Sequence, residues 1–269
     1  MSQTQREEGC HLTSKNRAKS IDSYWERYRE IYSFESTLSV YRERKAVEFI
    51  QSLGSSSTRI LEIGFGLRPI YKPLEAFGAY TGIEPGLEPF EIVLAEAAND
   101  ERVQVKHGFF NQWAPELRNS EYDAIISIGV LQDIPDPKEF LQELATLMGP
   151  ETLVYINVPN ANSLHRIIGL HSGHLASMED MSGRQTALEA KNLFTEDSLI
   201  KIITSSIDNV AIRNSGSFFV KPFTHAQMEE IMNREILGVD VMEGLYGSSG
   251  VLDGFGAELF VIFQIDNDE

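Results

Sequence analysis

The chain has 269 residues and a formal net charge of −17 at pH 7, from 23 Lys and Arg against 40 Asp and Glu. This charge repels nucleic acid and anionic lipid, so we expect neither as a partner. The one cysteine, Cys10, excludes an internal disulfide and a cysteine-based metal cage, and it favours the cytoplasm as the compartment. No run of about 18 apolar residues is present, so we expect no membrane-spanning helix.

The first 57 residues are predicted to contain a tail and two helices. Residues 1–19 are polar and are expected to be a disordered tail. Helices are predicted over residues 20–32 and 35–53, where apolar side chains recur at helical spacing. The first helix carries an aromatic stripe of Tyr24, Trp25, Tyr28 and Tyr32. This stripe is either ordinary helix packing or part of a lid, formed by residues 20–57, over a binding site.

Strands and helices alternate from residue 58 onward. Strands are predicted over residues 59–63, 79–83, 102–106, 122–128 and 152–158. Helices are predicted between them, over residues 69–77, 87–98 and 137–148. This alternation is typical of βαβ units, so we expect an α/β fold with a Rossmann-like, mainly parallel sheet. Residues 58–160 are predicted to be its cofactor-binding core.

The remaining residues, 161–269, are expected to complete the sheet within the same domain. Strands are predicted over residues 217–220 and 258–264, and helices over 195–204 and 225–237. The span of about 161–212 is longer than a simple helix connection requires. We therefore expect an insertion that caps the carboxyl edge of the sheet on the acceptor side, where loops commonly carry specificity.

Glu62, Gly64 and Gly66 form a Glu-x-Gly-x-Gly pattern between a predicted strand and a predicted helix. Glycines at this turn let the backbone approach a ligand closely at the carboxyl edge of the sheet. Glu84 ends the next strand, 20 residues after Gly64, where a carboxylate accepts hydrogen bonds from both hydroxyls of a ribose. The spacing therefore predicts a nucleoside-containing cofactor, and the alternative is a tight structural turn with a surface glutamate.

Charge at the same turn distinguishes between such cofactors. A dinucleotide-binding turn would have glycine at position 69, close to the pyrophosphate, and this chain has Pro69 there. Glu62 beside the turn would also repel a pyrophosphate. S-adenosylmethionine has no phosphate and carries a sulfonium and an ammonium group, which an acidic neighbour attracts. We therefore predict S-adenosylmethionine as the cofactor.

These features resemble the class I S-adenosylmethionine-dependent methyltransferases, in their small-molecule branch. The resemblance covers about residues 25–160 and rests on Leu61-Glu62-Ile63-Gly64-Phe65-Gly66, Gly82-Ile83-Glu84-Pro85, Val105-Lys106-His107-Gly108, Tyr122-Asp123-Ala124-Ile125-Ile126 and Asp136-Pro137. It implies a seven-stranded sheet with helices on both faces, an antiparallel last strand, an N-terminal helical lid and a cofactor across the first two strand ends. The cofactor-binding residues predicted on this basis are Tyr24, Glu62, Gly64, Phe65, Gly66, Glu84, Pro85, Gly108, Phe109, Phe110, Ile128 and Gly129.

The chain departs from the family pattern at three places. Arg68 replaces the third glycine often found in the loop. Phe109 replaces an acid that binds the adenine amino group in many members, so adenine is expected to stack on Phe109 or Phe110. Gln132 and Asp133 stand where this branch often has Glu and His, so that motif does not predict the acceptor chemistry.

The acceptor is expected at the carboxyl ends of the fourth and fifth strands. Asp133 there either serves the acceptor, by holding an ammonium group or taking a proton, or is a helix-entry carboxylate. His165 is either a base, since the unperturbed pKa of histidine is about 6.5, or a packed histidine. Arg166 either binds a carboxylate or forms a surface salt bridge. The predicted catalytic residues are Tyr28, Asp133 and His165, the predicted substrate-binding residues are Tyr28, Gln132, Asn157, Asn160 and Arg166, and no metal site is predicted.

The predicted function is transfer of a methyl group from S-adenosylmethionine to a small-molecule acceptor, mainly by positioning. Orientation of the reactants supplies roughly 7–11 kcal/mol of barrier reduction in such reactions. Two alternatives stay open at this point. One is a different use of the cofactor, such as intramolecular cyclisation or transfer of a larger group, and the other is a non-catalytic nucleoside-binding module. The sequence leaves the acceptor and a homodimeric state undecided.

Overall fold

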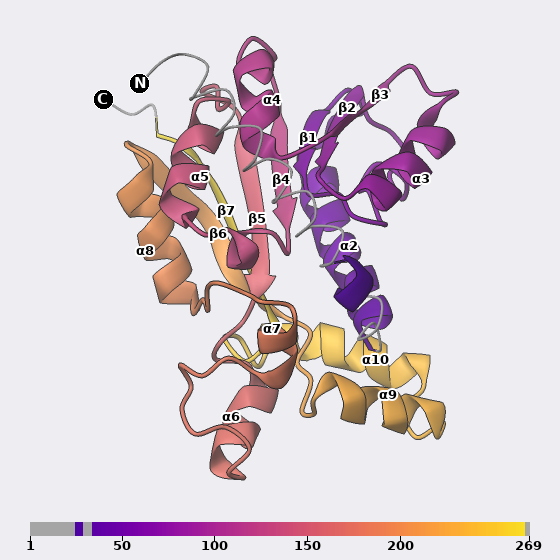
Figure 1. Ribbon diagram of the computed structural model, residues 1–269, viewed down its shortest axis with the longest axis vertical. Coiled ribbons are helices and arrows are strands. Elements are labelled where there is room, and N and C mark those ends of the chain that lie inside the picture. Colours follow the sequence, from indigo (N-terminus) through magenta and orange to yellow (C-terminus); the bar gives the residue numbers. More distant parts are fainter. Residues whose placement is uncertain (1–24, 29–33, 267–269) are drawn as a thin grey trace, which may run out of the picture.

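A seven-stranded sheet in the order β3-β2-β1-β4-β5-β7-β6 forms the centre of the molecule (Figure 1). The structure is a computed structural model that describes residues 25–28 and 34–266. The strands are β1 Arg59–Ile63, β2 Ala79–Glu84, β3 Val103–His107, β4 Ala124–Ile128, β5 Leu153–Pro159, β6 Val210–Phe218 and β7 Glu258–Ile265. Strands β1 to β5 pair in parallel, and β7 is antiparallel to both β5 and β6. The predicted Rossmann-like sheet with an antiparallel last strand is confirmed.

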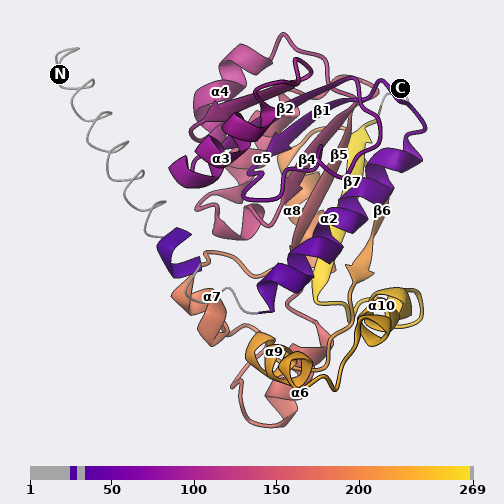
Figure 2. The ribbon, with the colours of Figure 1, turned by 90° about the vertical axis from the view of Figure 1, so that its right-hand side faces the viewer.

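Helices cover both faces of this sheet, as predicted. Helices α4 (Phe110–Leu117), α5 (Pro137–Ala145) and α8 (Glu196–Ser206) contribute to the core on one face. Figure 2 shows helix α2 (Glu35–Ser52) running across the opposite face, where it contacts β4 and β5. Helix α3 (Leu87–Ala97) packs against β2 and β3. Because both faces are covered, consecutive residues of the central strands are apolar rather than alternating, and Ala124, Ile125 and Ile126 of β4 are fully buried.

Four further helices gather beyond the carboxyl ends of the parallel strands (Figure 1). They are α6 (Leu164–His171), α7 (Gly183–Ala187), α9 (His225–Asn233) and α10 (Val239–Gly247). Two 3₁₀ turns, Leu131–Asp133 and Ser248–Gly250, complete the described elements. The segments on either side of β6 thus come together at the edge of the sheet where a ligand is expected. No helix in the described part of the chain is long and apolar enough to span a bilayer.

The prediction of a helix over residues 69–77 is wrong, since this segment forms turns. Pro73 would lie inside such a helix, where it lacks the N–H for the backbone ladder and clashes with the carbonyl four residues earlier. It also disfavours helical geometry at Lys72. The turns are held instead by Glu62, whose Oε2 accepts a hydrogen bond from the Ile70 N–H at 2.8 Å.

The strand predicted over residues 217–220 is also wrongly placed, because β6 spans Val210–Phe218. This strand is at the edge of the sheet, and Arg213 and Asn214 are exposed there, so its sequence lacks a continuous apolar pattern. Phe219 has a positive φ of 59°, which ends the strand where the prediction continued it. Helices α4, α6, α7 and α10 were not predicted. Pro115 inside α4 is one local reason.

The N-terminal predictions are only partly covered. The predicted tail, residues 1–19, and most of the first predicted helix, including Tyr24 and Tyr32, lie outside the described residues. Residues 25–28 are helical, and the second predicted helix is confirmed as α2. The remaining predicted strands and helices are found within four residues of their predicted bounds. The division of the chain into lid, core and cap stays a prediction.

Two buried tyrosines provide a matched test of this core. The Tyr80 hydroxyl donates to Glu62 Oε2 at 2.6 Å, whereas the buried Tyr155 hydroxyl has no partner among the described residues. We expect Tyr80→Phe to lower the free energy of unfolding by about 1–3 kcal/mol, because it removes a donor from a buried carboxyl group. Tyr155→Phe should be neutral or stabilising, because it removes an unsatisfied hydroxyl. Urea unfolding measures both, and an equal loss in the two variants would contradict this assignment.

Candidate active site

A cavity of about 1130 Å³ opens at the carboxyl ends of the parallel strands. Its wall is built from the loops that follow β1, β2 and β4, from α2 and α7, and from the starts of α6 and α9. The described N-terminal residues Trp25 and Tyr28 also line it. The cavity therefore lies where open α/β sheets bind their ligands, with apolar and charged side chains in the same wall.

The turn after β1 requires glycine at two positions. Gly64 and Gly66 have positive φ angles of 79° and 54°, which side chains disfavour. A Cβ atom on Gly64 would lie 2.4 Å from Cγ2 of Val130, in the loop after β4. The Gly64 N–H donates to the Ile83 carbonyl of β2 at 2.8 Å. The turn thus packs tightly against both neighbouring strand ends and presents bare backbone to the cavity.

Glu84 is buried at the end of β2 and holds this turn in place. Its Oε2 accepts from the Gly66 N–H at 2.9 Å, and its Oε1 accepts from the Gly86 N–H at 2.7 Å. The Trp25 side chain also hydrogen-bonds to it. Burial raises the pKa of Glu84 to about 7, although these hydrogen bonds oppose the shift. The carboxyl group therefore joins the two glycine turns at the cavity wall.

The indole of Trp25 occupies the space between these turns. A Cβ atom on Gly66 would lie 3.4 Å from Cη2 of Trp25, and one on Gly86 would lie 2.1 Å from its Nε1. The space beside Glu84 thus accommodates a flat ring that carries a hydrogen-bond donor. A ribose offers two hydroxyl donors at such a position, so the residues present fit a nucleoside there.

Glu62 is buried beside the same turn and lines the cavity. In the described part of the chain, both of its hydrogen bonds fall on Oε2, from Ile70 and Tyr80. Burial raises the pKa of Glu62 to about 7. Its first role is therefore structural, since it caps the turns that replace the predicted helix.

The residues predicted beside adenine differ in their surroundings. Phe109 is partly exposed and lines the cavity, next to the turn that contains Pro85. Phe110 also lines it but belongs to the core, where its ring lies 5.3 Å from that of Phe140. Gly108 does not line the cavity. Of the other predicted cofactor residues, Phe65, Ile128 and Gly129 line it, and Tyr24 lies outside the described residues.

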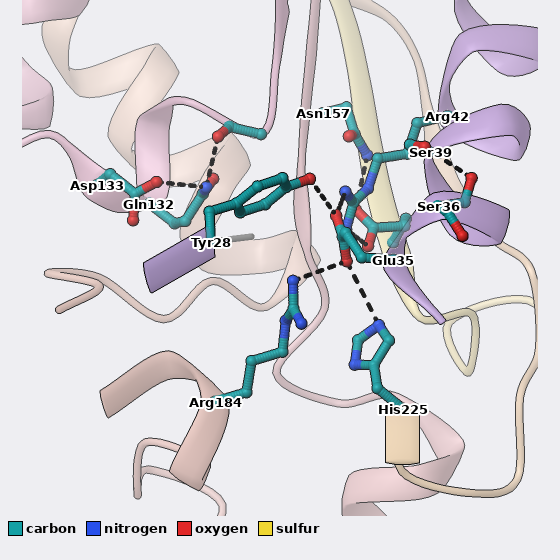
Figure 3. A network of polar contacts seen from close by, with 12 residues as sticks. Tyr28, Glu35, Ser36, Ser39, Arg42, Gln132, Asp133, Asn157, Arg184 and His225 are labelled. Carbon is teal, nitrogen blue, oxygen red and sulfur yellow. Dashed lines mark hydrogen bonds and ion pairs between the residues drawn. The ribbon is translucent and has the colours of Figure 1, made fainter. Parts of the chain in front are cut away.

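A buried ionic network, centred on Glu35 at the start of α2, lines the cavity beside β5 and β7 (Figure 3). The glycine turns follow β1 and β2, so we call the region around Glu35 the opposite end of the cavity. Glu35 forms an ion pair with Arg42 and another with Arg184, at 3.1 Å. It also accepts a hydrogen bond from the Tyr28 hydroxyl at 3.3 Å, and Nε2 of His225 lies 3.5 Å from its Oε2. Burial holds the pKa of His225 well below its usual value, so this imidazole is neutral at pH 7.

Arg42 links this network to the sheet. Its second amino group pairs with Oε1 of Glu258, the first residue of β7, at 2.6 Å. The Asn157 amide on β5 donates to the other oxygen of Glu258 at 3.1 Å. Sequence reasoning missed Glu35, Arg42 and Glu258, since charged residues on an amphipathic helix and at a strand end are ordinarily solvated. No local pattern marks them, because their partners come from four distant segments.

The predicted catalytic residues Tyr28, Asp133 and His165 all line the cavity. Asp133 accepts a hydrogen bond from the side chain of Gln132 at 3.0 Å, and Gln132 also donates to the Gly129 carbonyl. Nδ1 of His165 is shielded and has no partner among the described residues. Burial and the nearby Lys221 hold the pKa of His165 well below its usual value, so its ring is neutral.

Three residues predicted to bind the acceptor connect parts of the fold. Asn157 and Asn160 do not line the cavity, and Asn160 donates to the Gly254 and Gly256 carbonyls. Arg166 lines the cavity, but its guanidinium donates to the carbonyls of Ala161, Met178 and Asp180 and to Gln185. Their donors therefore hold the segment after β5 against the end of the sheet.

Comparison with known proteins identifies the family. A family described as a methyltransferase domain matches residues 38–205, and the chain belongs to it. The ubiquinone biosynthesis O-methyltransferase of Aeromonas salmonicida (strain A449) is 31% identical over 117 residues, which are 42% of this chain and 48% of that protein. The chain thus spans about half the length of this curated relative. The resemblance to class I S-adenosylmethionine-dependent methyltransferases is confirmed at the level of the family.

Solved structures show the same fold over nearly the whole chain. The plantazolicin methyltransferase BamL, in complex with a triazolic desmethylPZN analog and SAH, has a TM-score of 0.58 at 11% identity. The plantazolicin methyltransferase BpumL, in complex with SAH, has a TM-score of 0.56 at 14% identity. Each match covers 96% of this chain and 99% of the other chain. At this identity the likeness concerns the fold.

The raised pKa of Glu84 has a measurable consequence for stability. Its pKa is about 7 in the folded state, against an ordinary value of 4.5, so between these pH values Glu84 binds a proton only when the protein is folded. Its contribution to the free energy of unfolding is therefore present below pH 4.5 and is lost as the pH rises through 7. We expect the stability difference between wild type and Glu84→Gln to fall by at least about 1 kcal/mol over this range.

Urea unfolding at several pH values measures this difference. Glu91→Gln serves as the matched control for the substitution itself, because Glu91 is exposed on α3 and does not line the cavity. A difference for Glu84→Gln that does not vary with pH would show that Glu84 stays ionised in the folded protein.

Proposed function

We propose that this enzyme transfers the methyl group of S-adenosylmethionine to a small-molecule acceptor bound in the same cavity. The observation that carries the proposal is the continuity of that cavity. One wall contains the glycine turns and Glu84, the other contains the network around Glu35, and the volume of about 1130 Å³ is sufficient for two small ligands. The composition, with its single cysteine, keeps the cytoplasm as the expected compartment.

The residues at the glycine end are suited to hold the cofactor. The backbone of Gly64 and Gly66 leaves room for its methionine portion, and Glu62 beside them attracts an ammonium group once ionised. Glu84 would accept the ribose hydroxyls in place of the Trp25 indole, and Phe109 would stack on adenine. When bound, the cofactor supplies an electrophilic methyl group on a sulfonium.

The residues at the opposite end would orient the acceptor. Tyr28 reaches the Glu35 network with its hydroxyl, and its ring lies 5.3 Å from that of Trp25 in an edge contact. It therefore lies between the two ends of the cavity. His165 is neutral and lines the wall, and its Nδ1 has no partner among the described residues, so the ring would accept a hydrogen bond from a hydroxyl acceptor and help to orient it. Asp133, in the 3₁₀ turn after β4, would offer the acceptor a carboxylate in the cavity wall.

Calorimetric titration with S-adenosylhomocysteine tests the placement of the cofactor. We expect micromolar binding near one molecule per chain, and a Kd at least about tenfold higher for Glu84→Gln, because that variant loses an ionic acceptor for the ribose. Glu91→Gln should bind as the wild type does. Folded, ligand-free protein that gives neither heat nor thermal stabilisation would refute the proposal.

Product analysis distinguishes methyl transfer from other uses of the cofactor. Incubation with S-adenosylmethionine alone should leave it intact, since the proposed reaction needs a separate nucleophile. Rapid turnover without an acceptor would instead indicate cyclisation of the cofactor.

A further inference from the structure

Lys221 is a buried cation in the segment after β6, on the other side of the sheet from the glycine turns, which follow β1 and β2. Its side chain is 1% exposed and contributes to the cavity wall. Nζ donates to the Phe223 carbonyl at 3.1 Å, and no carboxylate of the described residues lies within ion-pair distance of it. An ammonium group removed from water in this way is unfavourable unless an anion accompanies it.

The two carboxylates that influence Lys221 are already engaged. Glu35 and Glu258 both act on it electrostatically, but Arg42 and Arg184 pair with Glu35, and Arg42 also pairs with Glu258. Tyr28 and Asn157 supply further hydrogen bonds to these two acids. Figure 3 shows Tyr28, Arg184 and His225 converging on Glu35 from different elements. Lys221 is therefore the cation that the network does not neutralise.

The network around Glu35 and Lys221 carries more positive than negative charge. Within this network, Arg42, Arg184 and protonated Lys221 carry three positive charges, and Glu35 and Glu258 carry two negative ones. Arg166, another buried cation of the cavity wall, is outside this set, because it binds backbone carbonyls and Gln185 and is attracted by Asp180. His165 and His225 are neutral because burial lowers their pKa values. One negative charge would balance the sum. Burial lowers the pKa of Lys221 to about 7. At neutral pH the ligand-free protein therefore reduces its excess positive charge in part by loss of the Lys221 proton.

We propose that the end of the cavity around Lys221 is a subsite for one carboxylate, and that the methyl acceptor is a small monocarboxylic acid. This inference rests on the proposed function, because it assigns the acceptor of the same cavity. One monoanion would make the charges of this network sum to zero, whereas a phosphate dianion would leave a net negative charge. The carboxylate would anchor the acceptor at Lys221 and direct its other end, past Tyr28, toward the glycine turns.

The two ends of the cavity would then prefer ligand groups of opposite charge. Glu62 and Glu84 lie at the glycine end, where they suit the positive charge of the cofactor. Lys221, Arg184 and Arg42 lie at the other end, where they suit an anion. The overall charge of −17 opposes large polyanions but does not oppose a buried single carboxylate.

Benzoate and its uncharged analogue benzamide are the probes for this subsite. Each is titrated by calorimetry onto the full-length protein, both alone and saturated with S-adenosylhomocysteine. We expect benzoate to bind at least tenfold more tightly than benzamide, and Lys221→Met to remove this preference. Lys191→Met is the matched control, since Lys191 also lines the cavity but is exposed, and it should keep the preference.

Proton uptake provides a second signature that a merely structural lysine would not give. Titration of benzoate at pH 7.5 in two buffers of different ionisation enthalpy should show protons bound by wild type and by Lys191→Met, but none by Lys221→Met. The binding of S-adenosylhomocysteine to each variant verifies its fold and tests the proposed cofactor site separately.

Three outcomes would overturn the assignment. They are equal binding of benzoate and benzamide, unchanged benzoate binding to Lys221→Met, and benzoate binding that stays undetectable at tens of millimolar. If S-adenosylhomocysteine binds in such a case, the cofactor site stands and only the carboxylate subsite is rejected. If S-adenosylhomocysteine fails to bind while benzoate behaves as expected, the carboxylate subsite stands alone.

Discussion

The ion pairs of Arg42 with Glu35 and Glu258 are the constraint on which the end of the cavity around Glu35 depends. They join helix α2 to strand β7, and through Glu35 they reach the N-terminal residue Tyr28 and helix α7. Removing one partner of such a buried pair typically costs about 3–5 kcal/mol, because the other charge is left buried alone. The network therefore ties these segments together in one cavity wall.

Buried charge organises the cavity at both ends. At the glycine end, Glu62 and Glu84 have raised pKa values because burial penalises their ionised forms. A positively charged ligand would favour ionisation of both. At the opposite end, Lys221 has a lowered pKa for the same physical reason. Each ligand would thus restore the charge that burial suppresses, and the Trp25–Tyr28 contact connects the two regions.

The helices around the cavity differ in how well sequence patterns predict them. Helix α2 has an apolar face at regular spacing, and it was predicted almost to the residue. Helices α6 and α7 are short, and their positions depend on Arg166 of α6, which binds carbonyls of the segment before α7 and Gln185 within it. The same local sequence around Arg166 is compatible with carboxylate binding and with this structural role. Only the positions of the distant carbonyls distinguish the two.

Local sequence patterns were enough to predict the parallel strands, the glycine turn and the acid at the end of β2, and through them the family. These features depend on short-range periodicity and on fixed spacing along the chain. The folded structure was needed to show that Asn157 and Asn160 lie outside the cavity, and that Glu35, Arg42 and Lys221 line it together. The reason is physical: the pKa and the pairing of a charged side chain depend on burial and on neighbours from distant segments, and neither is encoded in local spacing.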